Sequence, residues 1–428
     1  MIKVFIQNNP VYYSILKYTL GVFVHNKNIP LEYTSDLNLA DFIITENTDS
    51  DLPIALDFYS AIQKNNFNHT MFFKQDCCIY TNEGQADVLA TCFYMINSLQ
   101  EYNSTNYDEI ARFKYTESYQ FKFNNITENI IQQYFDKLAE HPKFKLEKSI
   151  QQHSSVFISH DIDNINSAWI EDGFAALKKG QVYHLFRLVF NAVLQKPDWL
   201  NMDRIMAIHN EYDITSTFFW LANKGRLNNR LTNADYDVRD KKVQETIALV
   251  KQNGFENGIH KSISDETFES EATKLNFKPA ANRYHYLKFK LPNSFNELEK
   301  ADIKLDASLG FAEHYGFRNS YGQAFQPFNL AKQKAYNLVE VPLHIMDRTF
   351  YNYMKTSTDI ISDRVISFFE ANKYNCTLSL LWHNNFFNSI KYGGYLTEYK
   401  KIIAYLYENN FKSLKQADII DKYLIFKD

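Results

Sequence analysis

The sequence predicts an α/β protein in which a smaller α/β N-terminal domain precedes a distorted parallel barrel of the (β/α)7 type. Three observations support this prediction. Seven short β-like runs follow residue 153, and amphipathic stretches of helical periodicity separate several of them. Three of the runs end in Asp or His, and three others carry His, Arg or Asp near their ends. The 428 residues, of which 45% are hydrophobic, suffice for two domains with buried cores.

Residues 1–145 are the predicted N-terminal domain. The β-like runs IKVFI, DFIITE, PIALDFY and CCIYT lie there beside helical patterns such as ADVLATCFYMINSLQEY. This part contains few histidines and no cluster of catalytic residue types, so we expect it to dock on the barrel or to mediate dimerisation. The polar, proline-containing stretch EHPKFKLEKSIQQH predicts the boundary, and the barrel takes residues 150–428.

The barrel strands are expected in chain order at SVFISHD, TSTFFWL, ENGIH, ANRYHYL, KLDASL, LVEVPLHI and TLSLLWH. Between them, KKVQETIALVKQNG predicts a helix that ends at Gly254. Strands that alternate with helices are typical of a parallel sheet.

The connection after the first barrel strand is far longer than the ~2–6 residues usual for such loops. It contains ALKKGQVYHLFRLVFNAVLQKPDWL, which predicts one or two helices with an apolar face and Lys/Arg flanks. We expect these helices to cap the mouth of the barrel. The alternative is a lid or interfacial segment that meets a lipid-linked sugar, with peripheral membrane contact.

Composition excludes several classes of protein. The net charge of −4 gives no basic field for nucleic acid. The four cysteines form no zinc-binding pattern, which favours a reducing compartment. The first apolar run breaks at Asn8-Asn9-Pro10, too early for a signal peptide, and no run approaches the ~18 apolar residues of a membrane span. We therefore expect a cytoplasmic protein.

Polar residues close the predicted barrel strands. Catalytic groups of a β/α barrel come from the carboxyl ends of its strands, so the successive strand ends should meet at one rim. Asp306, His344 and Asp347 rank lowest, and His160 is expected to face the barrel wall. The residues at or just after the strand ends are His160, Asp161, Asp163, His260, Arg283, His285, Asp306, Glu313, His314, Arg318, His344, Asp347 and His383.

Asp161 and Asp163 end the run VFISHDID. At a strand end the backbone turns, so two carboxylates spaced i, i+2 can point in different directions and take different roles. One can bind a metal, while the other acts as a general base. The alternative reading of the pair alone is a solvated turn.

The motif series resembles the polysaccharide deacetylases, carbohydrate esterase family 4. HDID, STFFWL, GIH, the Arg283 segment and LLWH follow the order of that family's motifs over residues 153–425. SHDID, GIHKS, RYHYL, SLGFAEHYGFR and LWHNN are similar to a divergent bacterial branch that carries an α/β N-terminal region. The resemblance implies a deacetylase barrel.

The resemblance also assigns roles. Asp161 matches the catalytic base, Arg283 the arginine that orients it, and His383 the general acid. Asp163 and His260 match two metal ligands.

One ligand position departs from the family pattern. The second histidine of the family's HSxxH motif would fall at position 264, which is Ser264. His285 is our first candidate for the replacement ligand and His314 the second. His314, Arg318 and Trp382 are the candidates for substrate binding, with Trp382 otherwise a core residue.

The implied activity is a metal-dependent hydrolysis that removes an N-acyl group, acetyl in the family, from a carbohydrate. The cofactor would be one divalent ion, Zn²⁺ first. The substrate stays open between a nucleotide-linked precursor, a lipid-linked precursor and a polymer. Two alternatives remain: an inactive glycan-binding barrel, which Ser264 motivates, and a metal-independent hydrolase of another non-peptide C–N bond.

Overall fold

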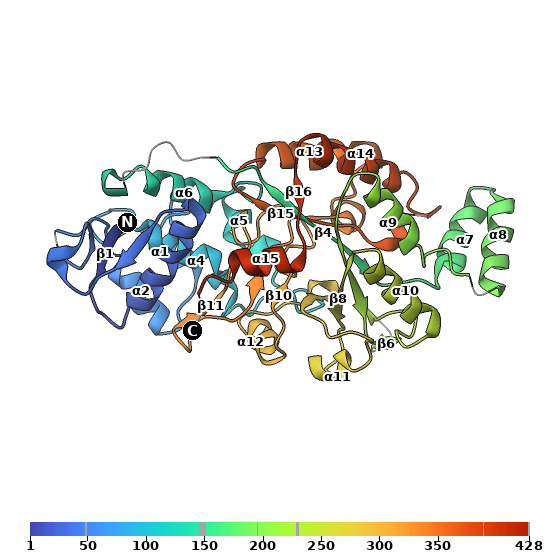
Figure 1. The fold of residues 1–428 in the computed structure, drawn as a ribbon, viewed down its shortest axis with the longest axis horizontal. Helices are drawn as coiled ribbons and strands as arrows, with labels where there is room; N and C mark the ends of the chain where they lie inside the picture. Colours follow the sequence, from blue (N-terminus) through green and yellow to red (C-terminus); the bar gives the residue numbers. More distant parts are fainter. Residues whose placement is uncertain (48, 145–150, 195, 228–230, 388, 427–428) are drawn as a thin grey trace.

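The computed structural model describes residues 1–47, 49–144, 151–194, 196–227, 231–387 and 389–426. It contains a three-stranded sheet near the N-terminus and a larger sheet formed by the rest of the chain (Figure 1). Much of the predicted boundary, residues 145–150, lies outside the described residues. Within the described part, no helix combines the length and apolar composition that a membrane span requires.

The N-terminal sheet is parallel, in the order β2-β1-β3. Its strands are β1 (Ile2–Ile6), β2 (Leu31–Tyr33) and β3 (Phe42–Ile44), and α1 (Tyr13–Lys27) connects the first two. The helices α2 (Leu56–Gln63), α4 (Val88–Ile96) and α6 (Ile130–Ala139) follow. The helix predicted in ADVLATCFYMINSLQEY is therefore present as α4, and the carboxylate of Asp87 caps it by accepting a hydrogen bond from the Ala90 N–H.

Two strands expected in this part are wrong. Most of PIALDFY belongs to α2, where Phe58, Ala61 and Ile62 recur at helical spacing and are buried. A short apolar run fits a buried strand and a buried helix equally well, and here the helical period prevails. CCIYT forms only an isolated bridge between Tyr80 and Ala86.

The large sheet is built from parallel pairs along the path β13-β10-β9-β8-β5-β4-β15-β14, and β16 (Lys412–Ser413) also pairs with β4. At its centre every residue of β4 is buried, as a parallel strand covered on both faces requires. The strands of the path are β4 (Ser155–Ile162), β5 (Thr217–Leu221), β8 (Glu256–Lys261), β9 (Ala281–Tyr284), β10 (Leu305–Asp306), β13 (Val339–Glu340), β14 (Ile345–Met346) and β15 (Thr377–Leu381).

The strand expected at LVEVPLHI is split in two. Its first part, β13, pairs with β10 at one end of the path, and its second part, β14, pairs with β15 at the other. Pro342 between them has no N–H to donate to a ladder. Residues 341–344 thus join the two ends of the path, and the parallel sheet is curled into a distorted half-barrel.

The N-terminal part packs directly on the barrel. Arg318 donates hydrogen bonds to both carboxylate oxygens of Glu101, at 2.9 and 2.5 Å, and both side chains are buried. Gly316 has a φ of +127°, and a Cβ there would clash with the backbone of Ile126. The stretch SLGFAEHYGFR therefore seats residues 101–126 against the barrel.

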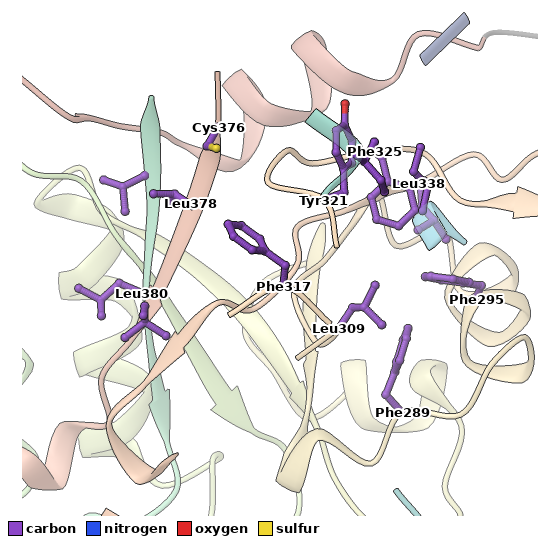
Figure 2. Packing of buried hydrophobic residues seen from close by; sticks show 14 of the residues in the cluster. Phe289, Phe295, Leu309, Phe317, Tyr321, Phe325, Leu338, Cys376, Leu378 and Leu380 are labelled. Atoms are coloured by element: carbon purple, nitrogen blue, oxygen red, sulfur yellow. The ribbon is translucent and has the colours of Figure 1, made fainter. Parts of the chain in front are cut away.

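One hydrophobic cluster extends across both parts of the chain. The ring of Tyr18 lies 5.0 Å from that of Phe328, which joins α1 to the C-terminal two-thirds. Inside the barrel part, Phe317 and Leu309 fill the space between Leu378 of β15 and the region around α12 (Asn293–Lys300) (Figure 2).

The long connection after β4 forms α7 (Ala168–Lys178) and α8 (Val182–Val193). The two helices pack on each other, and Figure 1 shows them at the end of the molecule opposite β1. The expected cap over the barrel mouth is wrong, because Phe174, Phe186 and Val193 expose 60%, 70% and 74% of their surface.

Candidate metal centre and active site

The carboxyl ends of β4, β8, β9 and β15 meet around one cavity of about 230 Å³. Parallel strands bring their carboxyl ends to the same rim, so residues far apart in sequence become neighbours. The strand-end residues that line the cavity are Asp161, Asp163, His260, His285 and His383.

Asp163, His260 and His285 form a candidate metal site, with one ligand atom from each lying within 4.8 Å of the others. The Oδ1 atom of Asp163 is 3.4 Å from Nε2 of His260 and 3.6 Å from Nε2 of His285. Ligands of a tetrahedral zinc ion bonded at about 2.0–2.2 Å lie roughly 3.3–3.6 Å apart. Oδ1 of Asp163 is also buried without a hydrogen-bond partner among the described residues. The donor set therefore fits a small divalent cation.

The backbone of β9 orients His260. Its Nδ1 lies 2.8 Å from the carbonyl oxygen of Arg283 and donates to it, which directs Nε2 to the cavity. Burial alone would lower the pKa of His260, but the carboxylates of Asp161 and Asp163 more than offset burial and raise it. Two buried carboxylates thus favour a positive charge at this point.

The electrostatics of the other two donors suit metal binding. Burial would raise the pKa of Asp163, but the contact with His260 and the positive charge of Arg348 help to hold it well below its usual range. Burial lowers the pKa of His285 to about 3, so its imidazole is neutral and offers a lone pair.

His285 reaches the cavity through an unusual turn. It directly follows β9, and the next two residues, Tyr286 and Leu287, have φ of 58° and 54°. Non-glycine residues in this left-handed region are uncommon and cluster at functional sites. The turn also places Tyr286 on the cavity wall.

Ser264 does not take part in the cavity. Its hydroxyl accepts a hydrogen bond from Asn223 at 2.8 Å and lies 2.7 Å from that of Ser262, and Glu271 accepts a further bond at 3.3 Å. Lys261 closes this network through a 2.6 Å ion pair with Glu271. Of the two replacement ligands predicted, the structure brings His285 and not His314 to Asp163.

Asp161 is held from behind by a buried arginine. Nε of Arg283 lies 3.4 Å from Oδ1 of Asp161, and Nη2 of Arg283 donates to the hydroxyl of Ser159 at 2.8 Å. The Arg283 guanidinium also lies 5.2 Å from the ring centroid of Phe219. Arg283 thus touches the predicted base but does not line the cavity.

A second pair of acids lies near Arg283, where β10 and β13 place Asp306 opposite Glu340. Burial and the neighbouring carboxyl raise the pKa of Glu340 well above its usual range. Glu340 is therefore the protonated member of the pair. Asp306 accepts hydrogen bonds from Asn282 at 2.6 Å and Ser308 at 3.1 Å, so its carboxylate is engaged in the fold and not at the cavity.

His383 faces Asp163 from β15. Its Nε2 lies 3.6 Å from Oδ2 of Asp163, and its Nδ1 lies 2.7 Å from Oδ1 of Asp347. Asp347 ranked low in the sequence analysis, although it follows β14 directly as Asp161 and Asp163 end β4. The strand-end signal thus included Asp347, but its rank was too low.

Two arginines at the cavity were missed. Arg348 lies 3.4 Å from Oδ2 of Asp163, although in that segment only His344 and Asp347 were candidates. Arg112 comes from the N-terminal part, donates to the Tyr286 carbonyl at 3.1 Å and to the Tyr353 hydroxyl at 3.0 Å, and pairs with Asp108. No strand-end pattern could have revealed Arg112, because its contacts cross from one part of the chain to the other.

Three residues expected to bind substrate do not line the cavity. Arg318 is buried and is paired with Glu101. Trp382 is fully buried against Tyr399, so neither ring face is free to stack on a sugar. His314 contacts the carbonyl of Tyr315 through Nδ1 at 2.7 Å and stacks on the Tyr315 ring. These side chains hold the fold together around the site.

Comparisons with known proteins leave the function open. Residues 11–147 match the model of a family of unknown function (DUF7033). No curated protein matches the chain. A putative polysaccharide deacetylase from Mycobacterium smegmatis has a TM-score of 0.40 at 13% identity, with 64% of this chain and 92% of that chain covered. PuuE allantoinase also has a TM-score of 0.40, at 11% identity, with 62% and 89% covered.

A third solved structure is a pseudoenzyme of the CE4 family from Bacillus anthracis. It has a TM-score of 0.29 at 10% identity, with 66% of this chain and 72% of that chain covered. These scores and identities are low, and a function for this chain has to come from its own residues.

Proposed function

We propose that this protein is a metal-dependent hydrolase that removes an N-acyl group, in the first place acetyl, from a carbohydrate. One observation supports this most directly. The donor set Asp163, His260 and His285 lies between a carboxylate held by Arg283 and an imidazole held by Asp347. Amide hydrolysis needs these parts together: a Lewis acid, a general base and a general acid.

A zinc ion bound by these three residues would polarise the acyl carbonyl and lower the pKa of water. Zinc suits a set of two imidazoles and one carboxylate. The two histidines offer their Nε2 atoms, because the hydrogen bond from Nδ1 to the Arg283 carbonyl fixes the tautomer of His260 and burial keeps His285 neutral.

The chain's own groups would move the protons. Asp161 is buried at the cavity wall, and its Oδ2, 3.6 Å from Nε2 of His260, is the carboxylate oxygen that Arg283 does not hold, so it can accept a proton from water. His383 would donate the proton on Nε2 to the departing nitrogen, while Asp347 stabilises the imidazolium from the Nδ1 side. Arg283, 3.4 Å from Oδ1 of Asp161, orients this carboxylate.

The carbohydrate part of the proposal rests on the motif series HDID, GIH and LLWH. Arg112, Tyr286 and Tyr353 narrow the cavity, whose volume of about 230 Å³ suits a small group rather than a long polymer segment. Together these features favour a single N-acylated sugar as the part of the substrate that enters. We assign residues 150–428 to the hydrolase domain, and residues 1–145 to a domain that completes the cavity wall through Arg112.

A second candidate is metal-independent hydrolysis of another C–N bond. Its support is Arg348, whose guanidinium lies 3.4 Å from Asp163 and already supplies a positive charge there. In this reading Arg348 would stabilise the developing oxyanion.

Metal analysis combined with acetate release tests the proposal. Purified protein should hold near-stoichiometric zinc or another divalent ion. His260→Ala and His285→Ala should each lose it, and His314→Ala, the matched control, should keep it. Asp161→Asn should keep the metal but abolish acetate release from N-acetylated sugars. Activity that resists chelation would support the metal-independent candidate, and unchanged activity in Asp161→Asn would contradict both.

A further inference from the structure

The hairpin of α7 and α8 has an unusual surface for a protein with a well-formed core. The two helices meet through small and apolar residues: Gly173 packs against Leu185, and Ala176 and Leu188 are buried. The turn between them uses Gly180, whose φ is +67°. The inner faces of the two helices thus pack against each other, and their outer faces do not take part in this packing.

The hairpin is fixed to the rest of the molecule by polar contacts. Asp172 is fully buried and accepts hydrogen bonds from the hydroxyl of Ser389 and from the backbone N–H of Lys391, the latter at 2.9 Å. Lys391 also pairs with Glu171 at 2.8 Å. These contacts hold the hairpin in one orientation without covering its apolar faces.

The outer faces are apolar over most of their length. Of the 23 large hydrophobic residues that are exposed in the described part of the chain, 11 lie between residues 169 and 194. On α8 the spacing of Val182, Phe186, Val189 and Val193 puts all four on one side of the helix. The exposed set is Trp169, Ile170, Phe174, Leu177, Val182, Tyr183, Phe186, Val189, Phe190, Val193 and Leu194.

The charge of the same segment differs from that of the whole protein. Residues 169–196 contain Lys178, Lys179, Arg187 and Lys196 against Glu171 and Asp172, whereas the chain as a whole has a net charge of −4. Asp172 is fully buried, and Arg187 lies 3.6 Å from Asp198. Lys178 lies 4.6 Å from the ring centroid of Phe174, at the edge of the apolar surface. A helix surface with exposed Trp, Phe and Leu beside Lys and Arg is typical of segments that lie in the interface of an anionic membrane.

We propose that the α7–α8 hairpin docks this protein onto the surface of an anionic lipid bilayer. The apolar side chains would enter the boundary between headgroups and acyl chains, and the lysines would contact lipid phosphates. A second copy of the chain suits this surface less well, because a two-fold contact would bring the same basic residues of both copies together. The docking does not depend on the proposed hydrolysis.

The hairpin is attached at the rim of the candidate active site. Its first anchor, residues 165–167, lies just after Asp163 in the chain. The three backbone N–H groups of this anchor donate hydrogen bonds to the carboxylate of Asp235. Its second anchor, residues 389–391, follows His383 closely. Membrane docking would therefore bring the cavity near the bilayer.

Vesicle co-sedimentation tests the proposal. We expect the full chain to bind vesicles of phosphatidylcholine that contain phosphatidylglycerol, and to bind less at high salt. The double variant Phe186→Glu with Phe190→Glu should lower binding at least about tenfold, because two large apolar side chains no longer enter the interface. The matched control, Leu249→Glu with Tyr407→Glu on exposed positions of other helices, should bind as the unaltered protein does.

Lys178→Gln with Lys196→Gln isolates the electrostatic part. This variant should lose the preference for phosphatidylglycerol. No binding to either kind of vesicle, or equal binding by the phenylalanine variant with unchanged circular dichroism, would overturn the proposal. A dimer in sedimentation equilibrium that this variant dissociates, without vesicle binding, would also overturn it and would assign the surface to a second copy.

Discussion

The Nδ1 atom of His383 lies 2.7 Å from Oδ1 of Asp347, and Oδ2 of the same carboxylate accepts a 2.6 Å hydrogen bond from the backbone N–H of His383. The carboxylate thus fixes both the ring and the chain at the end of β15. An imidazole held in this way presents its Nε2 to the cavity in one tautomer.

Replacing this carboxylate should slow the proposed reaction without removing the metal. We expect Asp347→Asn to lower kcat by roughly 10²–10³-fold and to change KM little, because Asn cannot stabilise the His383 imidazolium. In the pH profile of kcat, the alkaline limb reports the general acid, and this limb should shift. Asp363→Asn, an exposed acid on α13 (Ile361–Ala371), is the control. A fall in kcat with no change in the pH profile would mean that Asp347 is only structural.

The sequence predicts those site residues that lie at the carboxyl ends of the parallel strands. Asp161, Asp163, His260 and His383 end or follow strands, and alternation of apolar runs with helices places those ends at one rim. The strand-end position alone could not tell which polar residues turn inward. His314 and Arg318 follow a strand as well, but Arg318 pairs with Glu101, and such a pairing depends on how the N-terminal part packs.

The missing ligand illustrates the same limit. Position 264 has the family spacing, yet its side chain belongs to the network of Asn223, Ser262 and Glu271. His285 lies on the next strand end, where a left-handed turn brings it to Asp163. Spacing along the chain cannot reveal a ligand that arrives through a turn in another strand.

Restoring the usual histidine should therefore not restore the site. In a His285→Ala background, which we expect to lose the metal, Ser264→His should leave metal content low. The new imidazole would replace a hydroxyl that contacts Asn223 and Glu271 rather than the cavity. Inductively coupled plasma mass spectrometry on the double variant measures this. Recovery of one metal ion per chain would show that residue 264 can reach Asp163.

Replacing either of two buried glutamates by glutamine should change the free energy of unfolding by very different amounts. Glu340→Gln should change the free energy of unfolding by less than about 1 kcal/mol at pH 7, because its raised pKa keeps the carboxyl protonated and an amide resembles it. Glu101→Gln should cost about 3–5 kcal/mol, because it leaves the buried Arg318 without a counter-charge. Urea denaturation of both variants compares them directly. Equal losses would show that Glu340 is ionised.

Acid should destabilise the protein through histidines outside the site. Burial lowers the pKa of His344 to about 3 from an ordinary value of 6.5, and burial also holds the pKa of His209 well below that value. The unfolded chain therefore binds more protons than the folded chain below pH 6.5, so stability is present above that pH and is lost as pH falls towards 3.

Each of these histidines should contribute a slope of about 1.4 kcal/mol per pH unit well below its unfolded pKa. His344→Asn removes one such proton while keeping an acceptor for the Ser379 N–H, which now donates to Nδ1 at 3.1 Å. Urea denaturation between pH 4.5 and 8 should therefore show a slope reduced by that amount in the variant. His153→Asn, at an exposed position, serves as the control. An unchanged slope in His344→Asn would mean that His344 does not resist protonation in the folded state.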